Sequence, residues 1–313
     1  MQPQHPRRMI NEAVREHSLL QLVDALESVK ANPLPNSSIR QLLPSVLRQC
    51  VRHGSVDLVR YLLTYEKTPV KSLSPLTVSA NPSIALLELL LAHGWDINKA
   101  EAGGPLSRAH KLIDLVCNDD HLVRWLVEHG ARVADGEVDD YGLFPQPSPL
   151  LETCAVKGSV TTFRYLQDEG ALLGRRTLHR AVGEAASFGT DPFTDGQQDY
   201  DVETCRDAEY EPCQDRARRR ERAEMLLFLV DEMKLDINAM DSVVANRAYH
   251  WGTPLCYAAV QEKGASVVRW LLEKGAQPMV KIAQNVADSE MLAKTTGCRE
   301  NARILREWKQ AHC

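Results

Sequence analysis

A short phrase of apolar residues recurs along the chain, and this repetition constrains the fold more than any other feature. Four copies are clear and two are fainter, and they lie at residues 58–63, 122–127, 162–166, 267–272, 86–91 and 225–230. Self-similarity at a regular period is typical of stacked-repeat proteins, in which each unit buries its apolar face against its neighbours. The repetition therefore predicts an array of helix pairs that shares one elongated core.

One position of the phrase, usually aromatic, measures the repeat length. It is occupied in chain order by Tyr61, Leu89, Trp125, Tyr165, Phe228 and Trp270. The steps between them are 28, 36, 40, 63 and 42 residues. A unit of about 33 residues with loop insertions explains every step except the one of 63. We expect these side chains to pack between repeats, and the arginines beside them to face solvent, namely Arg60, Arg124, Arg164 and Arg269.

The residues that follow the phrase predict where its helix ends. A glycine comes next in four copies, at Gly94, Gly130, Gly170 and Gly275. Glycine is favoured there because the residue after a helix often adopts a positive φ. Short extended stretches follow, such as the Asp-Ile-Asn sequences at 96–98 and 236–238. These signals predict a helix, a turn and a polar connector in each unit.

A turn motif stands before the last copy of the phrase. Residues 252–259 read Gly-Thr-Pro-Leu-Cys-Tyr-Ala-Ala, and Gly275-Ala276 follows the helix. Partial versions occur at 177–181 and 148–150. The sequence therefore resembles the ankyrin-repeat family over roughly residues 40–280, although most of the family's turn histidines are replaced and two repeats lack the Ala-Ala pair.

The resemblance implies an all-α fold, an ankyrin-repeat solenoid of about six to seven helix pairs with capping helices and one long insertion. We expect residues 1–313 to form a single array. Within it, residues 1–39 would be the N-terminal cap and 281–313 the C-terminal cap. Helical spacing of apolar residues predicts a helix pair at 9–30 and helices over 280–309.

The step of 63 residues contains an insertion, at about 184–221. Between 191 and 215 it holds nine acidic residues and one basic residue. A run of arginines follows, Arg216, Arg218, Arg219, Arg220 and Arg222, which we interpret as the charged start of the next helix. A loop this long is usually either solvated or functional, so a lid over the concave face remains the alternative to a solvated connector.

Composition excludes several classes of function. The net charge of -5 argues against a nucleic-acid-binding surface, which would be basic. No apolar run is long enough to span a membrane. The eight cysteines lack the spacing of a metal or redox site, so we expect no metal and no cofactor, and we expect reduced thiols in the cytoplasm or nucleus. Cys50 and Cys154, each four residues before a glycine, are expected to fill the core.

Candidate binding residues gather near the expected finger tips and inner helices. Aromatic and arginine side chains are enriched at binding surfaces because they combine large contact area with hydrogen bonding. The predicted binding residues are Tyr141, Phe144, Arg176, Arg180, Tyr249, His250, Trp251 and Tyr257. The alternative for Tyr249 and Trp251 is packing beneath the insertion.

Two functions follow from this arrangement. The resemblance implies a scaffold that binds a protein or peptide in a concave groove, because ankyrin proteins usually bind and rarely catalyse. The alternative is an enzyme or small-molecule binder whose pocket the insertion closes, and the sequence favours the non-enzyme without deciding. Its acid–base candidates would be His250, His179, Asp139 and Asp140. A third arrangement is a homo-oligomer joined through the tryptophan-bearing faces.

Overall fold

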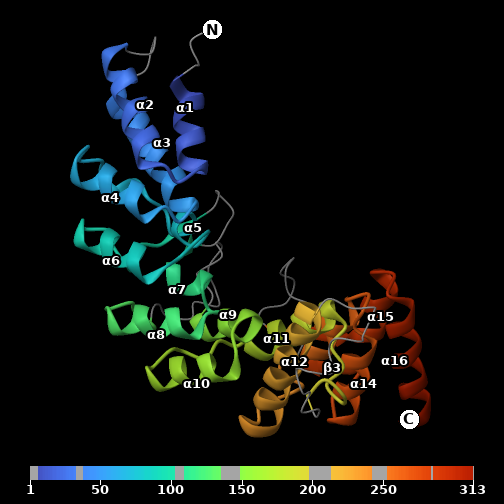
Figure 1. Ribbon diagram of the computed structural model, residues 1–313. Coiled ribbons are helices and arrows are strands. Elements are labelled where there is room, and N and C mark those ends of the chain that lie inside the picture. The colour runs from blue at the N-terminus through green and yellow to red at the C-terminus, as the bar shows by residue number, and fades with distance from the viewer. Residues whose placement is uncertain are drawn as a thin grey trace. The chain divides into compact units, whose positions relative to one another are not determined.

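The computed structural model describes residues 6–32, 38–102, 109–134, 149–196, 213–241, 252–282 and 285–312. Contacts divide these residues into two compact units, one up to residue 132 and the other from residue 133 onward. Both units consist mostly of helices, as the sequence predicted (Figure 1).

The first unit is built from consecutive helices that pack against near neighbours in the chain. Contacts join α1 to α2, α3 to α4, α3 to α5 and α4 to α6. The elements are α1 (Pro6–Arg15), α2 (Leu19–Ala31), α3 (Ile39–Arg52), α4 (Val56–Thr64), η1 (Val70–Ser72), α5 (Pro75–Val78), α6 (Ile84–Ala92), β1 (Glu101–Ala102), β2 (Ala109–His110), α7 (Leu112–Leu115) and α8 (Asp120–Glu128). The helix pair predicted over 9–30 is confirmed as α1 and α2.

The second unit continues the same design. The first helices of its pairs stack, with α11 packed against both α9 and α13, while α10, α12 and α14 contact those first helices. The elements are α9 (Leu150–Lys157), α10 (Val160–Asp168), α11 (Thr177–Phe188), α12 (Cys213–Leu227), the π-helical turn η3 (Phe228–Glu232), α13 (Pro254–Ala259), α14 (Ala265–Glu273), β3 (Met279–Ile282), β4 (Asn285–Asp288), α15 (Ser289–Thr295) and α16 (Arg299–His312).

Short polar side chains start the second helices of the pairs. Ser83, Asp119 and Ser159 each accept a hydrogen bond from the backbone N–H three residues later, at 3.3, 2.9 and 3.0 Å. This contact satisfies a donor that the first helical turn would otherwise leave unpaired. These three helices and α14 end next to the predicted glycines Gly94, Gly130, Gly170 and Gly275, whose φ angles are all positive, from +83° to +95°. The sequence signals for helix ends are therefore confirmed.

A repeated asparagine joins each of two turns to the turn of the next repeat. The side chain of Asn98 donates to the carbonyl of Gly130 at 2.9 Å and accepts from the N–H of Arg132 at 2.7 Å. The side chain of Asn238 makes the same two contacts with Gly275 and Gln277, at 3.3 and 2.8 Å. These paired bonds hold the register between neighbouring repeats.

The recurrent aromatic position lies largely within the core. Leu89, Trp125, Phe228 and Trp270 are buried, whereas Tyr61 and Tyr165 are half-buried. Among the neighbouring arginines, Arg60, Arg164 and Arg269 are exposed, while Arg124 is half-buried in an ion pair with Asp120. Cys50 and Cys154 are fully buried, which confirms their role as core residues.

Both ends of the expected insertion are helical. Helix α11 continues to Phe188, and α12 begins at Cys213, so the arginine run lies in a helix as predicted. Arg222 is buried, and its guanidinium donates to the carbonyls of Ala155, Val156 and Gly158 at the end of α9. Residues 197–212 of the insertion lie outside the described residues.

The prediction of helices throughout 280–309 is wrong at its start. Strands β3 and β4 are antiparallel and pair Val280 with Ala287 and Lys281 with Val286. The pairing sends alternate side chains to opposite faces. Val280 and Ala287 are therefore buried beside Cys256, whereas Val286 is exposed. The helical prediction holds for α15 and α16.

Candidate functional site

Three adjoining helices of the second unit carry a polar residue at the same position of the repeat. Glu152, Arg180 and Tyr257 follow by three residues Pro149, Thr177 and Pro254, respectively. Because α11 packs against both α9 and α13, these side chains face one another across the stacked first helices. Together with Arg176, His179 and Asp241 they form a group that we call the polar cluster.

Glu152 is the acidic centre of one half of the polar cluster. Its side chain is buried, and Oε1 accepts the backbone N–H of Arg176 at 2.9 Å. Oε2 lies 3.8 Å from Nη1 of Arg180. The backbone at Gly174 approaches this carboxylate so closely that a Cβ there would lie 2.3 Å from Oε1. Glycine at 174 therefore makes room for the buried acid.

Asp241 organises the other half. Its Oδ2 accepts the hydroxyl of Tyr257 at 2.8 Å and the backbone N–H of Gly252 at 3.2 Å. The backbone N–H of Asp241 donates in return to the carbonyl of Gly252 at 2.9 Å. Burial, followed by the charge of Asp241, raises the pKa of Tyr257 above its ordinary value, so this phenol stays protonated.

His179 of α11 contacts the Asp241 half of the polar cluster. The ring is 1% exposed, packs edge-on against Tyr257 at 5.3 Å between centroids, and places Nε2 2.9 Å from the carbonyl of Ala239. Since a carbonyl only accepts, Nε2 carries the proton. Burial lowers the pKa of His179 to about 4, so the ring is neutral at pH 7.

The two arginines are the part of the cluster that solvent reaches. Arg176 and Arg180 are both half-buried. Burial lowers the pKa of Arg180, and the nearby Glu152 carboxylate opposes that shift. Nε of Arg176 is buried and has no hydrogen-bond acceptor within the described part of the chain.

The structure brings together the predicted site residues that it describes. Arg176, Arg180 and Tyr257 from the binding set meet His179 from the catalytic set in the polar cluster. The other predicted residues lie outside the described residues, and they are Asp139, Asp140, Tyr141, Phe144, Tyr249, His250 and Trp251.

Sequence reasoning missed Glu152 and Asp241. Glu152 could have been found from its repeat position, which it shares with Arg180 and Tyr257. Asp241 carries no such signal, because its importance arises only when the chain after Asn238 turns toward Gly252. The negative charges of Glu152 and Asp241 offset the positive charges of Arg176 and Arg180.

Apart from the arginines, the ionisable side chains of the polar cluster are either neutral or engaged in hydrogen bonds. Its tyrosine and histidine are held neutral, and its carboxylates are already occupied by hydrogen bonds. Within the described ranges, no group of three or more histidine, cysteine, aspartate or glutamate side chains could hold a metal ion. None of the described helices is long and apolar enough to cross a membrane.

Two comparisons with known proteins found similarity to ankyrin repeats. The family model "Ankyrin repeat" matches residues 252–282, which include α13, α14 and β3. A crystal structure of the human ASB11 ankyrin repeat domain covers 95% of this chain and 96% of its own, with 15% identity and a TM-score of 0.41. No curated protein matches the sequence. The match at 252–282 falls on the turn motif and helix pair described above, so this segment of the chain is similar to an ankyrin repeat.

Proposed function

We propose that the chain is a protein- or peptide-binding scaffold, and that the polar cluster forms part of its binding surface. Ankyrin repeats generally mediate protein binding. The supporting observation is that Arg176, Arg180 and Tyr257, chosen as binding residues from the sequence, are neighbours on the stacked first helices. Two half-buried guanidiniums beside an aromatic ring are a combination typical of binding hot spots.

The ligand chemistry follows from the arginines. The half-buried guanidinium of Arg176 adds a positive charge beside Arg180 and Tyr257, which favours a partner's acidic or carbonyl groups. The tip residues Tyr141, Phe144, Tyr249, His250 and Trp251 remain proposed binding residues from the sequence. The buried free thiols of Cys50, Cys117, Cys154, Cys256 and Cys298 favour an intracellular location, in the cytoplasm or nucleus.

The test is quantitative affinity capture with matched variants of the full chain. Tagged wild type, the double variant Arg176→Gln/Arg180→Gln and the control Arg269→Gln are compared on one lysate of the source cells by mass spectrometry. We expect a partner whose recovery falls about tenfold or more with the double variant, since hot-spot residues contribute about 2 kcal/mol each. Recovery should be unchanged with Arg269→Gln, because that side chain is exposed on α14.

Thermal unfolding of each variant provides the folding control. The proposal fails if every captured protein is recovered equally with the folded double variant and the wild type. If the double variant does not fold, Arg176→Lys/Arg180→Lys takes its place. That variant keeps the charge but loses the planar, two-pronged hydrogen bonding of arginine.

A further inference from the structure

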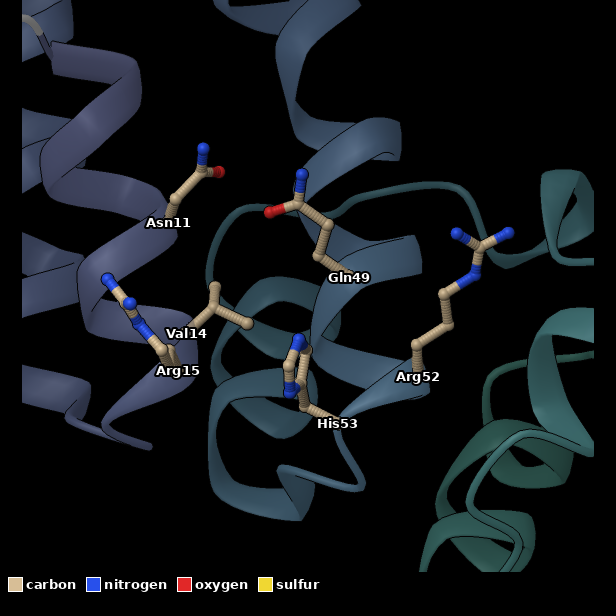
Figure 2. Close-up of a pocket in the computed structure, with 6 residues that line it drawn as sticks. All are labelled: Asn11, Val14, Arg15, Gln49, Arg52 and His53. Atoms are coloured by element: carbon tan, nitrogen blue, oxygen red, sulfur yellow. The ribbon is translucent and has the colours of Figure 1, made fainter.

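Helices α1 and α3 enclose a groove that the polar cluster does not use. Two adjoining cavities of about 480 and 320 Å³ lie between these helices, and Asn11 and Gln49 line both. Asn11, Val14 and Arg15 come from the side of α1, and Gln49, Arg52 and His53 come from the side of α3 (Figure 2). We call this feature the α1/α3 groove.

The floor of the groove is apolar. Ile10, Val14 and Val46 are each at most 2% exposed and line the cavities with their side chains. Val14 points into the space between the two helices (Figure 2). A ligand that enters the groove therefore contacts a small apolar surface. Burying an apolar side chain of the ligand against this surface is favourable.

The rim of the groove is cationic. Arg7, Arg15 and Arg52 line the cavities and are exposed, whereas no acidic residue of the described chain lines either one. This distribution runs against the net charge of -5 of the whole chain. The groove therefore differs in sign from the average surface, and its potential favours a negatively charged ligand.

The rim arginines are not used within the described structure. Arg15 and Arg52 take part in no ion pair or side-chain hydrogen bond among the described residues, unlike Arg8, which bonds Glu12 at 3.0 Å. Glu16, which directly follows α1, accepts from the side chain of Gln21 at 2.9 Å. The charges of Arg15 and Arg52 are therefore available to a partner.

We propose that the α1/α3 groove binds an acidic peptide segment of a partner protein, with an apolar side chain of the peptide on the floor and its carboxylates at Arg15 and Arg52. The amides of Asn11 and Gln49 lie beside the floor and can bond the peptide backbone. Nucleic acid fits less well, because single-strand binding sites combine basic charge with aromatic rings for base stacking. The groove offers an apolar floor and only one ring, that of His53.

The experiment selects ligands without assuming their sequence. A phage library of random peptides is panned in parallel on the full chain, on the variant Arg15→Glu/Arg52→Glu and on the control Arg60→Glu. Arg60 is exposed on α4 and does not line the groove, so the control removes a positive charge of the same kind elsewhere in the unit. Enriched peptides are then measured by fluorescence anisotropy.

We expect wild type and Arg60→Glu to enrich peptides that combine Asp or Glu with a large apolar residue, and the double variant to bind them about tenfold or more weakly. The proposal is overturned if such peptides are not enriched, or if they bind the folded double variant as well as wild type. It is also overturned if a single-stranded RNA binds more tightly than the peptides and displaces them.

If charge reversal prevents folding, Arg15→Gln/Arg52→Gln is used. The variant Arg176→Gln/Arg180→Gln should bind these peptides normally, which separates this proposal from the preceding one.

Discussion

Burial acts in opposite directions on the pKa values of two neighbouring side chains, with the same chemical result. It lowers the pKa of His179 and raises that of Tyr257, because in each case the charged form is disfavoured away from water. Both groups stay neutral over a wide pH range. The charge of the polar cluster is therefore carried by two arginines and two carboxylates.

The buried His179 predicts a specific loss of stability in acid. Its pKa is about 4 in the folded chain and about 6.5 when exposed, so the unfolded state takes up the proton first as the pH falls. The free energy of unfolding should therefore decrease from about pH 6.5 to about pH 4, by roughly 3 kcal/mol for this group. Urea unfolding at a series of pH values measures the decrease.

Two variants isolate the contribution of His179 from that of the carboxylates. His179→Gln keeps an N–H for the Ala239 carbonyl and does not titrate, so its stability should vary less over this pH range than that of wild type. His121→Gln changes an exposed histidine and should leave the pH dependence as it is. Identical pH profiles for His179→Gln and wild type would contradict the assignment.

At the scale of elements, a side chain from a later helix closes the end of a first helix. Arg222 of α12 does this for α9, and Asn301 of α16 does it for α13, donating to the carbonyls of Ala259 and Gln261 at 3.0 and 2.7 Å. Such carbonyls have no partner inside their own helix. The two contacts give the stacked pairs a shared geometry despite different residue types.

Loss of the Arg222 cap should destabilise the second unit. Arg222→Met keeps much of the side-chain volume but leaves three buried carbonyls without their donors, at an expected cost of about 3 kcal/mol. Arg220→Met removes an exposed arginine of the same helix, whose pair with Glu224 should contribute less than about 0.5 kcal/mol. Urea unfolding followed by circular dichroism compares them. Equal midpoints for the two variants would show that the cap is not important.

The sequence predicted those structural features that depend on residues close together in the chain. Glycine at helix ends and the recurrent aromatic position follow from local periodicity, so Gly275 and Trp270 were assigned correctly. Strands β3 and β4 were missed because Val280, Ile282 and Val286 also fit a helical spacing, and only the pairing of the two strands decides between helix and strand. Asp241 was missed because its partners approach it only in the folded chain.

At the scale of the whole molecule, each compact unit has its own buried residues. Leu62 of α4 and Leu271 of α14 are both completely buried. In repeat proteins each element is stabilised mainly by its immediate neighbours, so separate stretches can open separately. The continuous array over residues 1–313 that the sequence suggested stays a prediction.

Hydrogen exchange of two core variants tests this organisation. Leu62→Ala and Leu271→Ala should each cost about 2–5 kcal/mol, and each should lower amide protection mainly within its own unit. Mass spectrometry of peptide fragments locates the change. If either variant lowers protection equally through both units, the chain behaves as one cooperative array.

The contact between Arg222 and the end of α9 also bears on how the chain is synthesised. The carbonyls of Ala155, Val156 and Gly158 emerge from the ribosome more than sixty residues before the guanidinium that they bind. During translation α9 therefore ends in water until α12 has been released. A nascent chain stalled within the acidic insertion would carry a complete first unit and an incomplete second unit. We therefore expect a chaperone to protect the nascent chain most at this stage of translation.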